Sequence, residues 1–340
     1  MNAPRPPSKQ SSAWNSKRSS TKGAALISAM ITVTLVATLA SAALWQQWRH
    51  VEIESAERSR GQTAWLLTGA LDFTRLVLRE DKGPADHLAE PWALGLQESK
   101  LSTFLSQDKQ WREGDPEVFL SGFITDAQSR LNLRNLIDNG QASRSGRASF
   151  AKLFTLLGLP LRELDTLQQQ LLRAQLAATA TTAQVSSGSA NAAPLLPQRT
   201  AQWVWLGLSP RTVAQLAPYA VILPEPTPLN VNTAGPEALY ASIPGLDMAT
   251  AQQFVRQRAN LPPLETPEAA AKALGVQWDP QQHGIATQYF LIRGRMRLDD
   301  TLQEDELLVE RKGRQVNIVW RERGVQHLTA QARLLQSVSP

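Results

Sequence analysis

Residues 23–45 read GAALISAMITVTLVATLASAALW and contain no charged side chain. As an α-helix this stretch would be roughly 34 Å long at about 1.5 Å per residue, enough to cross a bilayer core of about 30 Å. A helix inside a globular domain is rarely apolar on every side. We therefore predict that this stretch inserts into a membrane.

The residues before this stretch form a basic tail. Residues 1–22 contain no Asp or Glu, and five basic residues there account for the whole formal net charge of +5: Arg5, Lys9, Lys17, Arg18 and Lys22. The remainder of the chain is formally neutral, which removes the support that a basic protein would give to a nucleic-acid partner. The positive-inside rule keeps such a tail in the cytoplasm, so everything after Trp45 is predicted to lie across the membrane.

Three fates are open to the apolar stretch. It could remain as a plain signal anchor, or it could be a secretory signal peptide cut after Ala40-Ser41-Ala42, which fits the small-x-small pattern. It could also be cut after Gly23, leaving Ala24 as the first residue of a mature protein that keeps its apolar helix. The junction Lys22-Gly23-Ala24 favours the third fate, because a basic residue and a Gly meet the apolar helix as at the prepilin peptidase site of pilins and pseudopilins.

The helix is predicted to continue beyond the membrane. Apolar and small residues recur at three- and four-residue steps, with charges between them, and no Pro interrupts the chain from residue 24 to Pro84. The recurring positions are Ala64, Leu67, Leu71, Thr74 and Leu78. One long helix, with one half in lipid and the other packed on a globular domain, is the plan of a pilin. The alternative is an anchor followed by an unrelated amphipathic helix.

An ordered set of motifs resembles the GspK family, the large minor pseudopilins of type II secretion systems. Besides Gly23, the motifs are Glu90-Pro91-Trp92-Ala93, ITDAQSRLNLRNLI (124–137), APYAVILP (217–224) and LNVNTAGPEAL (229–239). The resemblance implies an α+β fold, in which a pilin-like long N-terminal helix lies on an antiparallel sheet and a large helical insert interrupts the sheet. The implied function is that of a minor pseudopilin at the pseudopilus tip, which initiates assembly and supports protein export across the outer membrane.

The fifth residue of the mature chain, counted from Ala24, is Ser28, where most pilin-like proteins carry Glu. A carboxylate buried in lipid or in a filament core needs a partner. In pilin-like filaments that partner is thought to be the amino terminus of the subunit already in place. A tip subunit has no predecessor, so the absence of Glu agrees with a tip position, and family members also lack it. Neutral drift is the alternative.

Strands are predicted on both sides of the insert. VFLSGFITD (118–126) is predicted as a strand and RLNLRNL (130–136) as its hairpin partner. Three alternating segments near the carboxyl end are predicted as an antiparallel meander: 289–299, 302–313 and 314–324. The resulting organisation is a prepilin leader (1–23), an N-terminal helix (24–84), a pseudopilin α/β domain (85–148 with 287–330), a first helical insert subdomain (149–226) and a second, SAM-like one (227–286).

The first insert subdomain is predicted to be helical by its periodicity, except at 177–194. That stretch, AATATTAQVSSGSANAAP, is of low complexity and is predicted to be a mobile surface loop. Ser209-Pro210 is predicted as the cap and first turn of a later helix. The residues Trp203, Trp205 and Leu206 before it are predicted to belong to the core rather than to bind a ligand.

The second insert subdomain opens with PLNVNTAGPEALYASIPGLD (228–247), in which Asn230 and Asn232 flank Val231. Thr233 is predicted to cap a helix that has Pro236 in its first turn. The predicted buried face of this helix is Ala238, Leu239 and Ile243, and that of the next helix is Met248, Ala251, Phe254 and Val255. Thr266-Pro267 is predicted to open a third helix that ends before Gly275.

Such a stretch opens helix-hairpin-helix modules, many of which bind DNA. Their turn commonly reads Gly-x-Gly, because two glycines let backbone N–H groups approach a phosphate at a helix N-terminus. Here the turn reads Gly245-Leu246-Asp247, and the Asp247 carboxylate would itself take the place of a phosphate. We predict a packing and interaction module without nucleic acid. The alternative is an envelope-anchored DNA-binding protein of DNA uptake.

No catalytic motif is found in the sequence. G-x-S-x-G, Walker A and G-x-G-x-x-G are absent, and so is Cys, which excludes thiolate metal sites. The four histidines do not pair at metal-ligand spacing and are predicted to be solvent-facing or hydrogen-bonded: His50, His87, His283 and His327. An acidic run is predicted as a solvated hairpin loop, with calcium binding as the alternative: Asp299, Asp300, Glu304, Asp305 and Glu306. We predict that the protein is not an enzyme.

The resemblance also carries expectations about ligands, partners and location. Family members can hold calcium in the α-domain, but residues 170–198 lack any Asp or Glu, so that site is not carried over and no cofactor is predicted. The implied partners are the I- and J-type minor pseudopilins, the major pseudopilin, the inner-membrane assembly platform and the prepilin peptidase. The implied location is the inner membrane of a Gram-negative bacterium, crossed once, with most of the chain in the periplasm.

Overall fold

The computed structural model describes residues 21–81, 83–101, 117–179, 193–298 and 301–324. The chain divides into two compact units, Met1–Gly61 and Gln62–Pro340. Helix α1 (Thr21–Glu80) runs through the division, so the predicted single long helix is confirmed and ends before the predicted boundary at Pro84. Most of the leader predicted for 1–23 lies outside the described residues.

From Gly23 to Gly61, α1 is exposed at every position except the half-buried Ser59. Among the described residues, α1 is the one helix long and apolar enough to cross a membrane, with a mean hydropathy of 2.0 in its most apolar window. Its few hydroxyl groups bond to the backbone one turn earlier; Thr32 Oγ1, for example, donates to the Ala29 carbonyl (2.9 Å). Polar side chains in the apolar stretch are therefore satisfied within the helix itself, as a lipid environment requires.

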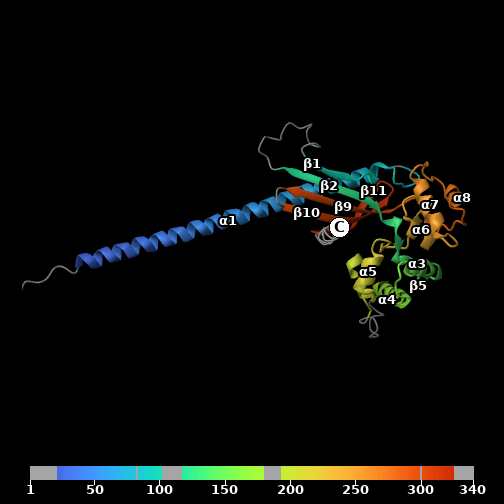
Figure 1. Ribbon diagram of the computed structural model, residues 1–340, viewed down its shortest axis with the longest axis horizontal. Helices are drawn as coiled ribbons and strands as arrows, with labels where there is room; N and C mark the ends of the chain where they lie inside the picture. Colours follow the sequence, from blue (N-terminus) through green and yellow to red (C-terminus); the bar gives the residue numbers. More distant parts are fainter. Residues whose placement is uncertain (1–20, 82, 102–116, 180–192, 299–300, 325–340) are drawn as a thin grey trace, which may run out of the picture. The chain divides into compact units, whose positions relative to one another are not determined.

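The second unit contains a five-stranded antiparallel sheet in the order β1-β2-β9-β10-β11 (Figure 1). The strands are β1 (Leu96–Lys100), β2 (Val118–Asp126), β9 (Tyr289–Leu298), β10 (Thr301–Lys312) and β11 (Gln315–Arg323). Strand β9 alternates buried and half-buried residues along its length, as a strand with two different faces should. The predicted strand at 118–126 and the predicted meander near the carboxyl end are confirmed.

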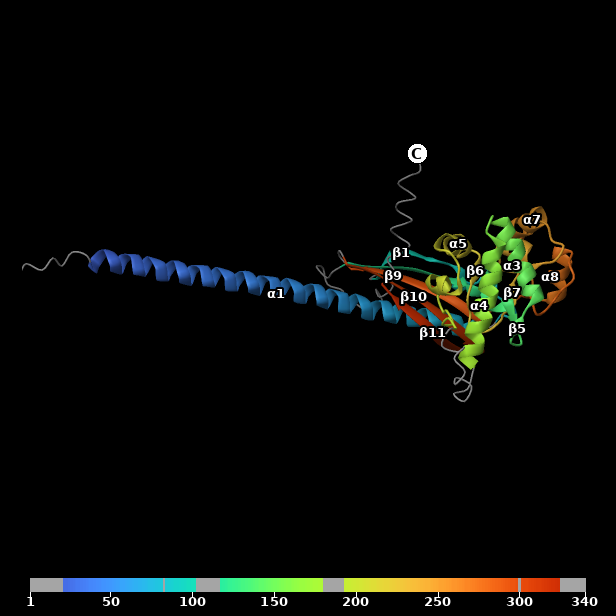
Figure 2. The same ribbon diagram turned by 90° about the horizontal axis from the view of Figure 1, so that it is seen from below.

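The last turns of α1 pack on one face of this sheet (Figure 2). Leu67, Leu71 and Leu78 are buried there, at the spacing that the sequence predicted. The helix packs tightly over Gly294, where an added Cβ would lie 3.0 Å from both Leu67 Cδ1 and Leu71 Cδ2. A side chain at position 294 would therefore require these two Leu side chains to shift by a few tenths of an ångström.

The insert leaves the sheet after β2 and returns to it at β9. It begins with η2 (Ala127–Ser129), β3 (Leu131–Asn132), η3 (Leu133–Leu136), β4 (Ile137–Asp138) and β5 (Gln141–Ala142). One group of helices follows, namely α3 (Arg144–Leu156), α4 (Leu161–Thr179), η5 (Thr200–Leu206) and α5 (Pro210–Leu216). Its first helix therefore begins before the predicted boundary at Ser149.

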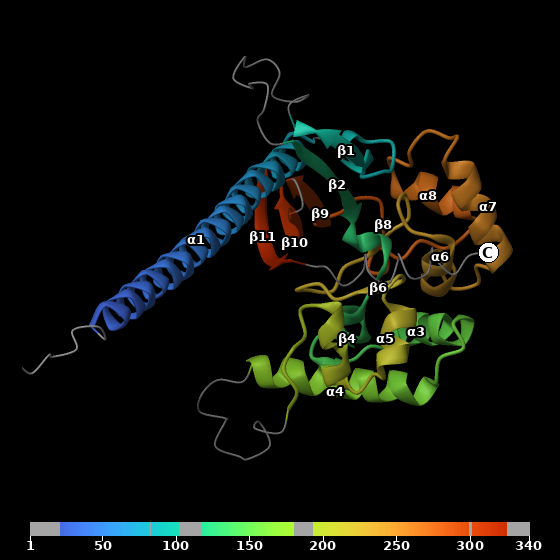
Figure 3. The same ribbon diagram turned by 60° about the vertical axis from the view of Figure 1, so that its left-hand side comes forward.

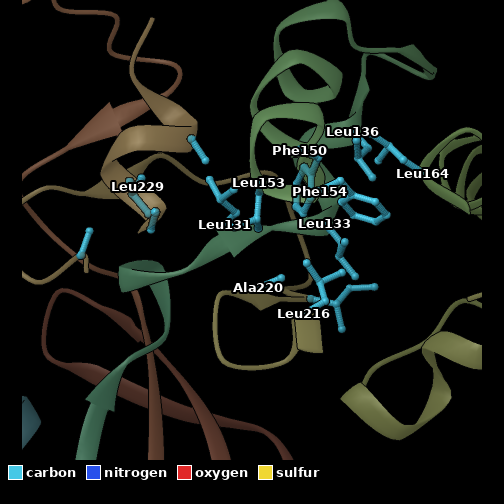
Figure 4. Packing of buried hydrophobic residues seen from close by; sticks show 14 of the residues in the cluster. Leu131, Leu133, Leu136, Phe150, Leu153, Phe154, Leu164, Leu216, Ala220 and Leu229 are labelled. Atoms are coloured by element: carbon cyan, nitrogen blue, oxygen red, sulfur yellow. The ribbon is translucent and has the colours of Figure 1, made fainter. Parts of the chain in front are cut away.

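A second group of helices completes the insert (Figure 3). It consists of α6 (Pro236–Ser242), α7 (Met248–Arg258) and α8 (Pro267–Leu274), with β6 (Ala220–Val221), β7 (Leu229–Asn230) and β8 (His283–Gly284) around it. One hydrophobic cluster runs through both groups. Figure 4 shows part of this cluster, with Phe150, Leu153 and Phe154 of α3 beside Leu131 and Leu133. The short 3-10 helix η1 (Pro91–Ala93) follows α1 outside the insert.

The predicted hairpin between 118–126 and 130–136 is wrong. Strand β2 pairs with β1 and β9, whereas residues 131–132 form the parallel strand β3 with β6. The chain turns away at η2, where the Asp126 carboxylate accepts a hydrogen bond from Gln128 N (2.7 Å). Beyond this turn Leu131, Asn132 and Leu133 are all buried, so both faces of the segment lie in the insert rather than one face on the sheet.

The prediction of a solvated acidic loop is also wrong. Glu304, Asp305 and Glu306 lie within β10, and Asp305 is fully buried. Arginines on the neighbouring strands neutralise them: Arg295 Nε lies 2.6 Å from a Glu304 oxygen and Arg321 Nε 2.9 Å from Asp305 Oδ2. The charges are therefore compatible with a packed strand. Asp299 and Asp300 lie outside the described residues.

Three further predictions concern the core residues at 203–206, the histidines and the loop at 177–194. Trp203 and Leu206 are buried, but Trp205 is 44% exposed, so its assignment to the core is wrong. His50 is exposed, and the buried His283 Nε2 lies 3.4 Å from the Ser242 carbonyl oxygen. The predicted loop at 177–194 begins within α4, and its residues 180–192 lie outside the described residues, as does His327.

Candidate functional site

The predicted processing site and the fifth mature position lie in the first turns of α1. Gly23, Ala24 and Ser28 are exposed, and Ser28 Oγ donates to the Ala25 carbonyl oxygen (2.9 Å). No acidic side chain occurs in α1 before Glu52. The apolar end of this helix therefore carries no negative charge that would need a partner in lipid or in a filament core.

The buried Asp126 carboxylate joins the insert to the sheet. It ends β2, and its Oδ2 accepts hydrogen bonds from Asn230 Nδ2 (2.9 Å) and from Thr233 Oγ1. Asn230 Nδ2 also lies within hydrogen-bond distance of the Asp86 carbonyl oxygen (3.0 Å) and of Thr287 Oγ1 (3.2 Å). Burial raises the pKa of Asp126 to about 6, although these donors favour the ionised form. We call Asp86, Asp126, Asn230, Thr233 and Thr287 the junction network.

A single arginine continues this network toward α1. Arg311 of β10 contacts the carboxylates of Asp81 and Asp86, and its Nη2 donates to the Thr287 carbonyl oxygen (3.0 Å). Burial raises the pKa of Asp86, against the opposing effect of Arg311. The chain after α1, the sheet and the end of the insert therefore meet at one ion-pair cluster.

Glu90 lies beside this cluster and accepts a hydrogen bond from Trp92 Nε1. Burial raises the pKa of Glu90 to about 7. Asp81, Asp86 and Glu90 are the described carboxylates that come close enough together to hold a metal ion, within 4.8 Å of one another. The guanidinium of Arg311 already contacts two of them, Asp81 and Asp86, so this cluster is better explained as an ion-pair network than as a metal site.

Asn232 connects the chain between α7 and α8 to the segment that contains Asn230. Its Nδ2 donates to the Leu264 carbonyl oxygen (3.0 Å), and its backbone N–H donates to Asn230 Oδ1 (3.0 Å). Buried amide side chains satisfy backbone groups that have no strand partner. The predicted motif residues Asn230, Asn232 and Thr233 are thus brought together, in a structural role.

The prediction that Thr233 caps a helix is wrong. Helix α6 begins at Pro236 with Gly235 at its N-cap, whereas Thr233 is buried and its hydroxyl donates to Asp126. The hydrogen bond from the Thr233 hydroxyl to the Asp126 carboxylate is charge-assisted, which makes it stronger than a neutral one. Pro236 does occupy the first turn of the helix, as predicted.

Gly245 and Asp247 lie apart from the junction network, in the turn between α6 and α7. Gly245 has a φ of 79°, a backbone conformation that favours glycine. The Asp247 carboxylate accepts from Thr250 N (2.9 Å) and Thr250 Oγ1 (2.8 Å), and these bonds lower its pKa. The predicted cap of the second helix is therefore confirmed, and an acidic side chain stands where a DNA-binding hairpin would receive a phosphate.

The roles of several residues at the junction were not predicted from the sequence. In the motif at 229–239, Asn230 and Asn232 alternate with Leu229 and Val231, a pattern that a solvent-facing row of residues would also show. Asp126 was recognised as the end of a strand but not as an acceptor. Asp86 and Arg311 are 225 positions apart, and no local pattern announces their contact.

Comparisons with known proteins agree on one family. Two family models, both described as type II secretion system (T2SS) protein K, match residues 129–225 and 229–287. The type II secretion system protein K of Pseudomonas aeruginosa is 25% identical over 301 residues, which is 83% of this chain and 86% of that protein.

A solved structure has the same fold. One chain of the crystal structure of the GspK-GspI-GspJ complex from the enterotoxigenic Escherichia coli type 2 secretion system matches with a TM-score of 0.51 and 17% identity. The match covers 79% of this chain and 98% of that one. A long N-terminal helix on an antiparallel sheet, together with these matches, defines a minor pseudopilin of type II secretion. Within that class, the family models and the relative match this chain to type II secretion system protein K.

Proposed function

We propose that this chain is the tip subunit of the type II secretion pseudopilus, where it initiates assembly and supports protein export across the outer membrane. The observation that carries the proposal is the position of the insert. It leaves the sheet at Asp126 and returns at Phe290, which are partners in adjacent strands. This is the end of the sheet where α1 ends, because Glu80 pairs with Arg314 in the turn from β10 to β11 (3.3 Å).

An insert at that end would occupy the space of a subunit stacked above this one. Subunits could then be added only below it, which is what a tip requires. The absence of Glu at Ser28 supports the same position, since a first subunit has no predecessor whose amino terminus would need a carboxylate. The single apolar helix fits a membrane anchor. We further propose that it lies in the inner membrane of a Gram-negative bacterium, with the second unit in the periplasm.

The proposed partners follow from the relative in the GspK-GspI-GspJ complex. This chain would bind the I- and J-type minor pseudopilins, and through them the major pseudopilin, the assembly platform and, during maturation, the prepilin peptidase. We propose no enzymatic activity, cofactor or nucleic-acid partner. The capping of α7 by Asp247 supports the last point, because that carboxylate would repel a phosphate.

The proposal can be tested in the first unit of the chain. Val33 is an exposed residue of the apolar stretch, so Val33→Asp would place a charge in lipid or in the helix bundle, at a cost of roughly 3 kcal/mol. We expect Val33→Asp to abolish co-purification with the I- and J-type subunits and to abolish secretion, while Val33→Leu leaves both unchanged. Normal secretion by the Asp variant would contradict the proposal.

The mass of the amino-terminal peptide from native membranes provides an independent test. Cleavage after Gly23 predicts an N-methylated Ala24 terminus. A terminus at Ala43 would instead identify an ordinary signal peptide, and the pseudopilus proposal would fail. An intact leader would identify a plain anchor and would favour the alternative of a DNA-uptake protein, which salt-dependent DNA binding would then have to support.

A further inference from the structure

A cleft of about 400 Å³ lies where the sheet meets the insert. Its wall is formed by β2, β9 and β10, by the segment before β6 and by the start of α6, whose positions can be followed in Figure 3. Six of its lining residues carry the argument: Phe123, Arg130, Tyr219, Glu237, Arg293 and Glu306. The volume lies within the range of about 300–1,000 Å³ that is typical of ligand pockets.

The two arginines of this cleft differ in their surroundings. Arg293 is paired, since its Nη2 lies 2.6 Å from Glu306 Oε1 and its guanidinium lies 5.4 Å from the centre of the Phe123 ring. Arg130 makes no hydrogen bond and no ion pair with the described residues, and its Nε is buried without a partner. Burial lowers the pKa of Arg130, and the carboxylates of Glu306 and Asp126 partly oppose this effect from a distance; an arginine remains protonated at neutral pH.

A guanidinium with a buried nitrogen that has no acceptor destabilises the protein that holds it. Burying a charged group without a partner costs free energy, whereas burying an apolar side chain does not. Packing alone would therefore favour Leu or Met at position 130. Arg130 also lines a second cavity of about 300 Å³ on the side of the insert. Arg130 therefore lines open space on two sides, and its buried Nε has no protein acceptor among the described residues.

We infer that this cleft binds an acidic side chain of another protein, with Arg130 as the group that receives the carboxylate. A guanidinium matches a carboxylate with two parallel hydrogen bonds. Phe123, which is 46% exposed, and Tyr219 provide surfaces for the apolar part of the bound segment. Glu237 makes no ion pair with the described residues, and its charge repels doubly charged phosphate more strongly than a single carboxylate, so the cleft favours a carboxylate over inorganic phosphate.

The test uses the full chain in detergent and two small probes. N-acetyl-glutamate amide carries the carboxylate, and N-acetyl-glutamine amide has the same shape without the charge. Saturation-transfer NMR should show binding of the Glu probe at millimolar concentration, at least about 10-fold tighter than binding of the Gln probe or of inorganic phosphate. Equal binding of the two amides, or tighter binding of phosphate, would overturn the inference.

Variants then assign the binding to Arg130. Arg130→Met should lose the preference for the Glu probe and raise the midpoint of thermal unfolding, because an unpaired charge is removed. Arg134→Met is the matched control: Arg134 is also buried with unpaired nitrogens but does not line the cleft, so the preference should remain.

If Arg130→Met does not fold, Arg130→Lys serves instead and should weaken the preference for the Glu probe. Retained preference in every Arg130 variant, or equal loss in the control, would refute the assignment. The inference does not depend on the tip position.

Discussion

The Asp126 carboxylate has a pKa that predicts how stability depends on pH. Its folded pKa is about 6, against an ordinary value of 3.8, because burial disfavours the charge. The folded state therefore binds this proton more tightly than the unfolded state does. The stability that Asp126 contributes is full below about pH 4 and is lost as the pH rises through about 6.

We predict that Asp126→Asn removes this dependence. The variant keeps the shape and one acceptor oxygen but cannot ionise. Between pH 4 and pH 7 the free energy of unfolding of the wild type should fall relative to the variant by on the order of 3 kcal/mol. Urea unfolding of the full chain in detergent at several pH values measures the difference. Asp138→Asn, at an exposed position, should show no such trend. A difference that does not change with pH would contradict the prediction.

Residue roles were predictable where the interaction is local. Asp247 caps the helix that follows it, because the donor Thr250 N lies three residues away. Thr233 is also a residue type that commonly caps helices, yet its hydroxyl donates a hydrogen bond to Asp126, which is 107 positions away. A hydroxyl can donate to a carboxylate and still accept from a backbone N–H, so the start of the helix decides the cap: Pro236 opens α6, and Gly235 is therefore its N-cap.

At the scale of elements, helix α3 lies so close to the segment 133–136 that one glycine decides the packing. A Cβ added at Gly146 would lie 1.9 Å from the Asn135 carbonyl oxygen. Gly-to-Ala changes in a helix interior usually stabilise, by about 0.5–1 kcal/mol. Here the clash requires the backbone to move, so Gly146→Ala should lower the free energy of unfolding by about 2 kcal/mol or more.

Gly69→Ala in α1 is the matched control. Gly69 is helical and exposed, and an added Cβ there would meet nothing within 4 Å. This variant should be neutral or slightly stabilised. Thermal and urea midpoints of the two variants should therefore move in different directions. The same small shift in both would mean that α3 can withdraw from residue 135 without cost.

Elements with a strong periodicity were the ones predicted correctly. The alternation along 289–299 and 314–324 indicated strands that have one buried face, and the spacing of Leu67, Leu71 and Leu78 indicated the packed face of α1. The segment 130–134 alternates too, through Arg130, Asn132 and Arg134, but Asn132 is buried and its amide is hydrogen-bonded within the insert. Polarity alone cannot distinguish such residues from a solvent-facing row.

At the scale of the whole molecule, the insert is an interruption of one hairpin. Asp126 of β2 pairs with Phe290 of β9, so Ala127 and Tyr289 would face each other if the strands were joined directly. The family resemblance predicted an interrupted sheet, while the strand partners at which the interruption occurs became visible only in the structure. Because Asp126 and Phe290 are strand partners, they show where the chain can be shortened by joining β2 directly to β9. The sequence alone could not have specified these two positions.

We predict that replacing residues 128–288 with Asn-Gly leaves a folded sheet. Asn-Gly favours the two-residue turn that matches the twist of antiparallel strands. The cluster between α1 and the sheet, with Leu67, Leu71 and Ile292, contains no residue of the insert. A second cluster loses Val221 and Leu223, so the shortened chain should be less stable than the full one.

Circular dichroism and limited proteolysis of the shortened chain in detergent would measure whether α1 and the sheet survive. We expect retained β-structure, cooperative unfolding at a lower midpoint and no restoration of secretion in a strain that lacks the full chain, because the end of the sheet beside Glu80 would be left open to a further subunit. A chain that does not fold would show that the sheet depends on the insert. A folded chain that restores secretion would instead show that the insert is dispensable, and the proposed tip function could then no longer rest on it.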